Sequence, residues 1–317
     1  MRILVTGACG YKGSVLVPKL LAAGHEVVGV DVMWFGNFLT VHKNLQLHRG
    51  DVRDFDRRLL DGVDCVVHLA SIANDPCGDL DPIGTWETSC LATERLADAA
   101  ARNGVKQFIY ASSASVYGLK EEEQITEDLE LLPISVYNQT KMVSERVLLS
   151  YRDQMKIQIV RPATVCGLSP RMRLDVVVNL LTMQALTKGH ITVLGGEQLR
   201  PNIHIQDITD LYCFFLDNPK ITGVYNAGNE NLSVLEIANL IGEYIACDIE
   251  IKPSNDPRSY RLNSDKVKSV GFNFKYDVRY AINEVSEAFK NKLLYDEQHS
   301  YNVSWMRGLM NKQVSRI

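Results

Sequence analysis

The chain has 317 residues, of which 46% are hydrophobic and 23% charged, so it can bury a full core in one large domain or two smaller ones. Its formal net charge is -4 without any run of lysines or arginines, which argues against a nucleic-acid or anionic-membrane surface, because phosphates require clustered positive charge. The seven cysteines are scattered without a Cys-x-x-Cys pair and support neither a disulfide framework nor a metal site.

The first residues carry no sign of a targeting segment. Met1 is followed at once by apolar residues 3–5, without a charged leader or a small-residue cleavage site. No apolar run approaches the roughly 18 residues that a membrane span needs. Together with the cysteine pattern, these features predict a cytoplasmic protein.

Short apolar runs in the first half of the chain predict buried strands. They cover residues 3–6, 27–31, 65–69, 108–112 and 157–160. Helical patterns lie between them, and buried strands that alternate with helices form parallel sheets with right-handed crossovers. The expected fold is therefore α/β, with a doubly wound parallel sheet of the Rossmann type.

The pattern changes after Gly167. A longer apolar helix pattern covers residues 174–186, and short strand-like pieces and prolines follow it. We therefore expect a first domain over residues 1–165 and a smaller, mixed α/β lobe over residues 166–317. Part of residues 201–230 is expected to return to the first domain.

A glycine turn follows the first strand and leads into the helical pattern of residues 14–23. Gly7, Gly10 and Gly13 allow the sharp backbone angles of such a turn and let a pyrophosphate approach the N-terminus of the helix. Asp31 ends the next strand, where a carboxylate can accept hydrogen bonds from an adenosine ribose diol and would repel a 2'-phosphate. An ordinary tight turn is the alternative, but the order of these features favours a dinucleotide site, and NAD over NADP.

The Gly-x-x-Gly-x-x-Gly spacing resembles that of the extended short-chain dehydrogenases/reductases, and two later segments extend the resemblance. Residues 50–54 look like the adenine-contacting segment of that family, and residues 67–70 look like the strand segment that lies along its cofactor. Each segment alone also fits a strand end with an acidic turn residue. The resemblance implies NAD as cofactor, with contacts from Gly7, Gly10, Tyr11, Lys12, Gly13, Asp31, Asp51, Val52, Leu69 and Ala70.

A serine-rich strand end and a tyrosine-lysine pair form the predicted catalytic centre. Ser113 lies in segment 110–118, and Tyr137 and Lys141 are four residues apart, hence on one face of a helix. The Lys141 ammonium is expected to lower the pKa of Tyr137, which would act as general base on a substrate hydroxyl. Ser113 would hydrogen-bond the same oxygen, and both Tyr137 and Lys141 would also contact the cofactor, Lys141 at the nicotinamide ribose. A Tyr-x-x-x-Lys pair alone is weak, because any amphipathic helix can carry one.

The residues after Ser113 exclude several reactions of the family. Its nucleotide-sugar 4,6-dehydratases carry an Asp-Glu pair where this chain has Ala114 and Ser115. Its decarboxylating members carry a glutamate at the position of Ser115, and the epimerase-reductases that make fucose-type sugars use a cysteine near this strand end. The resemblance therefore leaves oxidation and reduction, with or without inversion of the sugar carbon.

The second lobe resembles that of UDP-galactose 4-epimerase-like proteins. Residues 161–167 look like the strand that ends their cofactor domain, although Thr164 and Ser89 replace common asparagines. Asn179 looks like the diphosphate-facing residue at the start of a helix. The resemblance thus implies a lobe that binds a nucleoside-diphosphate sugar.

A strand-like segment later in this lobe adds a phosphate ligand. Residues 200–207 resemble the family's Arg-Asp-x-Ile-His-Val-x-Asp segment, in which Arg200 would offer planar, bidentate donors to a phosphate. Without the strand that follows, Arg200 would be interpreted as a surface arginine. His204 is expected to be a buried hydrogen-bonding residue rather than a catalyst.

Other arginines of the lobe are candidates for substrate contact. Residues 256–260 resemble the C-terminal substrate clamp of the family, in which Arg258 would replace an arginine that usually lies slightly upstream. Arg171 and Arg173 lie at the mouth of the lobe, in a segment that resembles a subgroup acting on nucleotide-linked sugars such as GDP-heptoses. Solvated loop arginines are an equally good interpretation of this pair.

The resemblance leaves three functions to compare. The leading one is an NAD-dependent nucleotide-sugar epimerase that acts at C4 through a transient keto-sugar. The second is a net NAD-dependent dehydrogenase that oxidises a nucleotide-linked sugar or heptose at C4. The third is a non-catalytic dinucleotide-sensing protein, against which the intact catalytic residues count. The resemblance also implies a homodimer through helices near residues 85–102 and 136–151.

Overall fold

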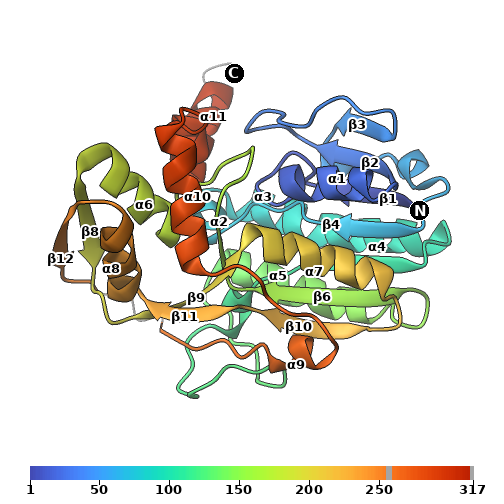
Figure 1. The fold of residues 1–317 in the computed structure, drawn as a ribbon. Helices are drawn as coiled ribbons and strands as arrows, with labels where there is room; N and C mark the ends of the chain where they lie inside the picture. Colours follow the sequence, from blue (N-terminus) through green and yellow to red (C-terminus); the bar gives the residue numbers. More distant parts are fainter. Residues whose placement is uncertain (255–258, 315–317) are drawn as a thin grey trace.

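A seven-stranded parallel sheet forms the centre of the computed structural model, which describes residues 1–254 and 259–314 (Figure 1). The strand order is β10-β6-β5-β4-β1-β2-β3, and each neighbouring pair is parallel. The strands are β1 (Arg2–Thr6), β2 (Glu26–Asp31), β3 (Leu45–Arg49), β4 (Cys65–His68), β5 (Gln107–Ala111), β6 (Lys156–Pro162) and β10 (Gly223–Ala227). The strand order reverses between β1 and β4, and open sheets of this kind bind ligands beyond the carboxyl ends of the strands at that point.

The strands predicted for the first half of the chain are confirmed, with small shifts at their ends. Their apolar residues are fully buried, and neighbours such as Ile3 and Leu4 belong to the cores on opposite faces of the sheet. The edge strand β3 was not predicted. Its residues are half-buried or exposed and lack a continuous apolar run.

Helices cover both faces of this sheet, as a doubly wound fold requires. They are α1 (Gly13–Ala22), α4 (Ala92–Arg102), α5 (Val136–Leu149) and α7 (Ile205–Asp217). Two short helices, α2 (Asp75–Leu80) and α3 (Pro82–Trp86), pack against α5. Short 3-10 or π-helical turns cover Val52–Asp54, Arg57–Leu60, Glu87–Leu91, Ala114–Tyr117 and Gln298–Ser300. Helices α1 and α7 contribute to the core on one face, whereas α4 and α5 contribute to the core on the other.

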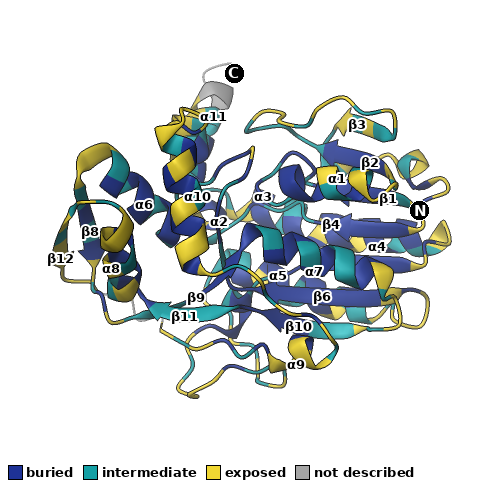
Figure 2. Ribbon diagram, in the orientation of Figure 1, coloured by how far each residue is buried: buried dark blue, intermediate teal, exposed yellow. Residues whose placement is uncertain are grey.

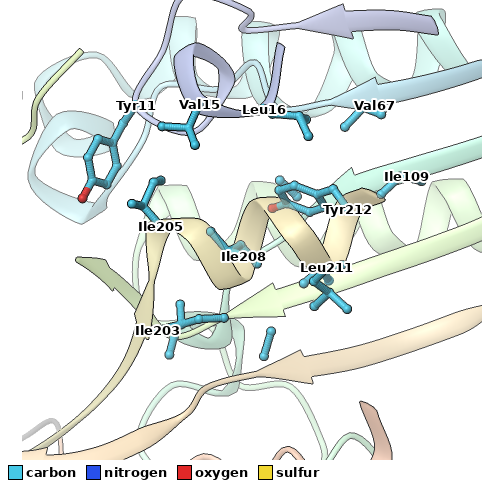
Figure 3. Close-up of a cluster of buried hydrophobic side chains, with 14 of the residues drawn as sticks. Tyr11, Val15, Leu16, Val67, Ile109, Ile203, Ile205, Ile208, Leu211 and Tyr212 are labelled. Atoms are coloured by element: carbon cyan, nitrogen blue, oxygen red, sulfur yellow. The ribbon is translucent and has the colours of Figure 1, made fainter. Parts of the chain in front are cut away.

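Side chains of α1, α7 and the large sheet form one apolar core. Figure 3 shows Ile208, Leu211 and Tyr212 of α7 among side chains from α1 and the strands, including Leu16 and Val67. These side chains are almost wholly buried. Apolar burial on this scale is the main contribution to stability in a globular domain.

A second lobe follows β6 and is built from smaller sheets. Its strands are β7 (Thr164–Cys166), β8 (His190–Leu194), β9 (Leu199–His204), β11 (Glu230–Ser233) and β12 (Asp248–Lys252). Its helices are α6 (Val177–Lys188), α8 (Val234–Tyr244) and α10 (Val278–Lys290). Strand β9 pairs with β7 in parallel and with β11 in antiparallel direction, and β8 pairs with β12 in parallel. Helices α6 and α8 pack on β8, and α10 packs on α6 and α8, around a separate apolar core.

The chain passes back to the large sheet after β9. Helix α7 covers one face of that sheet, and β10 extends it by pairing with β6. The short α9 (Asp265–Ser269) contacts β10. Residues 205–227 therefore belong with the large sheet, although in the sequence they follow strands β7, β8 and β9 of the second lobe.

The last helix, α11 (Asn302–Val314), lies against α2 of the first domain. Met306 forms a small buried cluster with Ile72 and Cys77, and Trp34 and Phe35 pack against it. The described end of the chain is thus attached beside the strand ends of the large sheet.

Exposed residues gather on the outer helix surfaces, the loops and the edge strand β3, whereas the central strands of the large sheet are buried (Figure 2). Within the described residues, no helix combines the length and hydropathy needed to cross a bilayer. The same residues contain no group of three or more metal-ligating side chains placed to hold an ion.

Candidate active site

A cavity of about 530 Å³ lies at the carboxyl ends of the central strands, between the large sheet and the second lobe. The glycine turn after β1, the ends of β2, β4 and β5, and the first turns of α5 line it on the side of the sheet. Arg171, Arg173 and residues 175–177 and 200–201 line it on the side of the second lobe. This is where an α/β fold of this topology places a ligand.

The glycine turn is too tightly packed for side chains at its key positions. Gly7 has φ +70°, and a Cβ there would lie 2.8 Å from the backbone nitrogen of Ala70. A Cβ on Gly13 would lie 2.2 Å from the carbonyl oxygen of Gly7, and one on Gly10 would lie 3.2 Å from the same oxygen. The turn therefore brings bare backbone to the cavity at the N-terminus of α1, which fits the diphosphate of a dinucleotide.

Asp31 lies at the end of β2 and borders the cavity. One carboxylate oxygen accepts a hydrogen bond from the Cys9 amide at 3.0 Å, and the other from the Met33 amide at 2.7 Å. These bonds fix the carboxylate and leave lone pairs for a ribose diol. The adenine-side residues Asp51 and Val52 and the strand-end residues Leu69 and Ala70 border the same cavity.

The predicted catalytic residues meet in this cavity, as the motifs indicate. Ser135 caps α5 by accepting a hydrogen bond from the Asn138 amide at 3.2 Å, so the helix begins one residue before Tyr137. Lys141 Nζ donates to the Ala111 carbonyl at 2.8 Å and lies 5.8 Å from the centroid of the Tyr137 ring. Ser113, Tyr137 and Lys141 all border the cavity.

Burial has the largest effect on the pKa of Tyr137 in this arrangement, and it acts against the lowering that the sequence predicts from Lys141. Burial raises the pKa of Tyr137 to about 12, although a hydrogen bond with Ser113 lowers it. Burial, together with the charge of Lys12, holds the pKa of Lys141 well below its ordinary value. The physical reason is desolvation, since a dry site disfavours the charged form of both groups.

Cationic side chains gather along the cavity. Lys12, Arg171, Arg173 and Lys141 all line it, and the carboxylate of Asp175 accepts a hydrogen bond from Arg173 Nε at 2.9 Å. Burial and the charge of Arg173 lower the pKa of Lys12 to about 8. Such a cluster favours an anionic ligand, because bound anions relieve the repulsion between the cations.

The residues predicted to bind the substrate differ in whether they border the cavity. Arg200 borders the cavity, but Asn179 is fully buried behind its wall. The Asn179 side chain accepts a hydrogen bond from the Gly167 amide at 2.9 Å and donates to the Arg173 carbonyl at 2.8 Å. Asn179 therefore shapes the loop that carries the arginines rather than facing the cavity. Arg258 lies outside the described residues.

His204 is the buried hydrogen-bonding residue that the sequence predicts. Its Nε2 lies 2.7 Å from the carboxylate of Glu284, and its ring contacts Tyr276 and Tyr280. His204 does not border the cavity. It therefore joins β9 to α10.

Several cavity residues were not predicted. Asn302 and Met306 reach the cavity from α11, and Trp34 and Phe35 reach it from the loop after β2. The sequence gives no signal that pairs these distant segments, since the tail beyond Lys290 has no clear pattern. Asn138 was also missed, although it adjoins Tyr137, and its side-chain oxygen accepts a hydrogen bond from Ser115 Oγ at 2.5 Å.

A buried polar network under the catalytic strand end was also missed. Glu145 accepts hydrogen bonds from the Arg161 guanidinium and from Ser112 Oγ. Tyr117 accepts a hydrogen bond from Arg161 Nη1 at 2.7 Å and donates to Asn226 Oδ1 at 2.8 Å. A helical-spacing signal was available, because Glu145 lies four residues after Lys141.

Comparison with known proteins agrees with this site. The model of the "NAD dependent epimerase/dehydratase family" matches residues 3–228. UDP-glucuronic acid decarboxylase 1 of Danio rerio is 30% identical, with 95% of this chain and 75% of that protein covered. UDP-glucose 4-epimerase of Lactobacillus helveticus is 27% identical, with 85% of this chain and 91% of that protein covered.

A solved structure gives the same result. The crystal structure of UDP-glucuronic acid 4-epimerase from Bacillus cereus, in complex with UDP-glucuronic acid and NAD, matches with a TM-score of 0.81 and 26% identity. The match covers 92% of this chain and 100% of that one. The glycine turn, the catalytic residues and these similarities lead to one conclusion: the chain is an enzyme that belongs to the NAD-dependent epimerase/dehydratase family.

Proposed function

We propose that this enzyme is a nucleotide-sugar 4-epimerase that keeps NAD bound through its catalytic cycle. The observation that carries the proposal is the meeting of Ser113, Tyr137 and Lys141 in one cavity with the glycine turn and the arginines of the second lobe. The two known 4-epimerases described above are similar over most of this chain. In this proposal, residues 1–165 bind the cofactor and residues 166–317 bind the nucleotide sugar, except that α7 and β10 belong to the first domain.

NAD, when held by the glycine turn and Asp31, would supply a hydride acceptor and donor for C4 of the sugar. Tyr137 accepts the proton of the C4 hydroxyl as the carbonyl forms, and returns it when the carbonyl is reduced. Ser113 hydrogen-bonds the same oxygen, whose charge changes during both steps. Because Tyr137 would take up and give back the same proton, it would end the cycle unchanged, as inversion at C4 without net oxidation requires.

The electrostatics of the cavity bear on the proton held by Tyr137. Burial raises the pKa of Tyr137 and so favours the neutral phenol, whereas a general base has to be the phenolate. The charge of Arg173 acts in the opposite direction, as does the hydrogen bond from Ser113. Proton uptake by Tyr137 therefore depends on the influences that favour the phenolate, which are the charge of Arg173 and the hydrogen bond with Ser113.

The residues next to Ser113 favour an epimerase over other family reactions. Ala114 is buried, and Ser115 Oγ lies 2.7 Å from Ser113 Oγ. Neither side chain can shuttle the protons that dehydration requires, and neither supplies the glutamate that the resemblance assigns to decarboxylases. Arg200 is proposed to bind the substrate diphosphate from the second lobe.

The test is incubation of the NAD-loaded enzyme with a panel of UDP-, GDP-, CDP- and dTDP-sugars. An epimerase converts one of them into its C4 epimer, seen by NMR, without accumulation of NADH absorbance. Stoichiometric NADH and a 4-keto product would instead establish net dehydrogenation, the second function considered above. If no nucleotide sugar binds or reacts, the proposal fails.

We also propose that the enzyme is a homodimer through the face formed by α4 and α5. The side chain of Leu91, in the turn that leads into α4, is 49% exposed on this monomer. Light scattering at micromolar concentration should report the mass of two chains. A monomer would contradict the proposal.

A further inference from the structure

Arg171 is the largest side chain that the structure buries fully. Its Nη2 donates a hydrogen bond to Asn302 Oδ1 at 2.5 Å, and its guanidinium carbon lies 3.9 Å from the centroid of the Phe35 ring. Its Nε is buried and has no hydrogen-bond partner among the described residues. Arg171 borders the cavity. One of its donors is therefore left unused in a dry environment.

The charge of Arg171 has no directly paired anion among the described residues. Within the described part of the chain, no carboxylate lies within ion-pair distance of Arg171, whereas the nearby Arg173 is paired with Asp175. Burial and the charge of Arg173 lower the pKa of Arg171 to about 9. Asp175 and Asp31 act in the opposite direction, but neither is paired directly with the guanidinium. A buried cation without a directly paired counter-charge is unfavourable, so an anionic ligand in the cavity would satisfy both its charge and its free donor.

The neighbours of Arg171 identify which part of the cavity this anion occupies. The Arg171 amide donates to Ser14 Oγ at 3.3 Å, and Ser14 belongs to the first turn of α1. Phe35 lies in the loop after β2, four residues beyond Asp31. The guanidinium is thus held beside the ends of β1 and β2, where a Rossmann fold binds the diphosphate of its dinucleotide. Arg200 reaches the cavity from β9 instead.

We propose that Arg171 is a cofactor-binding residue whose guanidinium binds the diphosphate of NAD from the second lobe, held in place by Asn302 of α11. The sequence predicts that Arg171 contacts the substrate, and this proposal assigns it to the cofactor instead. It depends on NAD binding alone and not on the identity of the sugar.

Helix α11 connects both sides of this contact. The Asn302 amide donates to Asp175 Oδ2 at 3.2 Å on the second lobe. Trp305 Nε1 donates to the Trp34 carbonyl at 2.6 Å in the loop after β2. The helix therefore sets Arg171 against the first domain, and loss of the Asn302 side chain should weaken NAD binding even though the arginine remains.

The test is calorimetry on cofactor-free protein with NAD, ADP-ribose and adenosine. Arg171→Gln should weaken NAD and ADP-ribose by about 10- to 100-fold, the loss of one charge-assisted contact, and leave adenosine unchanged. Asn302→Ala should weaken the same two ligands by less. Arg200→Gln is the matched control, because it removes a guanidinium from the other side of the cavity and should leave the affinity for NAD unchanged.

Three results would overturn the proposal. Equal NAD affinity in wild type and Arg171→Gln would show that no diphosphate contact exists. Weaker binding of UDP or GDP to the NAD-saturated variant, with NAD affinity unchanged, would show that Arg171 binds the substrate and not the cofactor. A larger loss for NADP than for NAD would place the guanidinium at the ribose 2' position. If Arg171→Gln does not fold by circular dichroism, Arg171→Lys and Asn302→Ala provide the same comparison.

Discussion

The Glu145 carboxylate accepts hydrogen bonds from Arg161 at 3.0 Å from Nε and 2.6 Å from Nη2, and their side chains are only 2% and 5% exposed. The pair joins α5 to β6 directly below Lys141. Removing one member leaves the other as an uncompensated buried charge, which costs roughly 3–5 kcal/mol. We expect Glu145→Ala to lower the free energy of unfolding by about that amount, as measured by urea denaturation.

The matched control for that variant is Glu243→Ala. Glu243 also pairs with an arginine, Arg279, but both side chains of this pair are exposed. Solvent screens such a pair, so its loss should change stability little. Equal losses from the two variants would mean that burial of the Glu145–Arg161 pair has no energetic consequence.

Tyr137→Phe should reduce turnover by at least ~100-fold, because it removes the general base. The ring and its contacts remain, so the affinity for NAD should be nearly unchanged. Turnover on the nucleotide sugar found in the panel experiment and calorimetry with NAD measure the two effects separately. Near-normal turnover would exclude Tyr137 as the base.

The carboxylate of Asp31 should make the enzyme prefer NAD over NADP. It would accept hydrogen bonds from the ribose diol and repel a 2'-phosphate. Asp31→Asn should reduce the difference in affinity between NAD and NADP. Asp54 is an exposed acid beyond β3, so Asp54→Asn should leave this difference unchanged. Titration that shows equal binding of NAD and NADP to the wild-type protein would contradict this role.

Arg200→Ala should weaken binding of a nucleoside diphosphate to the NAD-loaded protein by roughly 10- to 100-fold. The expected cause is loss of a charge-assisted contact with the diphosphate from β9. Affinity for NAD should barely change, and the exposed Arg152→Ala should have no effect on either ligand. If UDP and GDP bind equally well to wild type and variant, Arg200 is only a structural residue.

His68 should make the fold sensitive to mild acid. It is fully buried between Thr6 and Thr93, and burial, with the charge of Lys141, lowers its pKa from 6.5 to about 3. Between these values the unfolded chain binds a proton at this residue and the folded chain does not, so stability falls as the pH decreases.

The size of this effect is at most about 1.4 kcal/mol per pH unit, for one proton. The range from about pH 6 to about pH 4 lies between the two pKa values of His68. Over this range the free energy of unfolding of His68→Gln should decrease less with falling pH than that of the wild-type protein. The exposed His48→Gln provides the control. An unchanged slope in His68→Gln would show that another group controls acid unfolding.

Local spacing predicted most of the cofactor side of the site. The glycine turn depends on Gly7, Gly10 and Gly13 in one short segment, and Tyr137 and Lys141 are one helical turn apart. Patterns of this length are visible in a sequence because the backbone itself brings the residues together.

Long-range contacts account for what the sequence did not predict. Arg171 and Asn302 are 131 residues apart, and only the path of α11 brings them together. The raised pKa of Tyr137 likewise comes from burial by several segments, so the motif alone gave the opposite direction. Asn179 has the expected residue type, but the loop it supports determines where its amide points.

The return of α7 and β10 to the large sheet affects how the protein is made. During synthesis, strands β1 to β6 leave the ribosome before α7, and their apolar face, which includes Ile109 and Val160, then lacks its covering helix. The sheet can be completed only after Ala227 has emerged. A chain that ends near residue 165 would therefore leave this apolar face without α7, and exposed apolar surface of this kind favours aggregation.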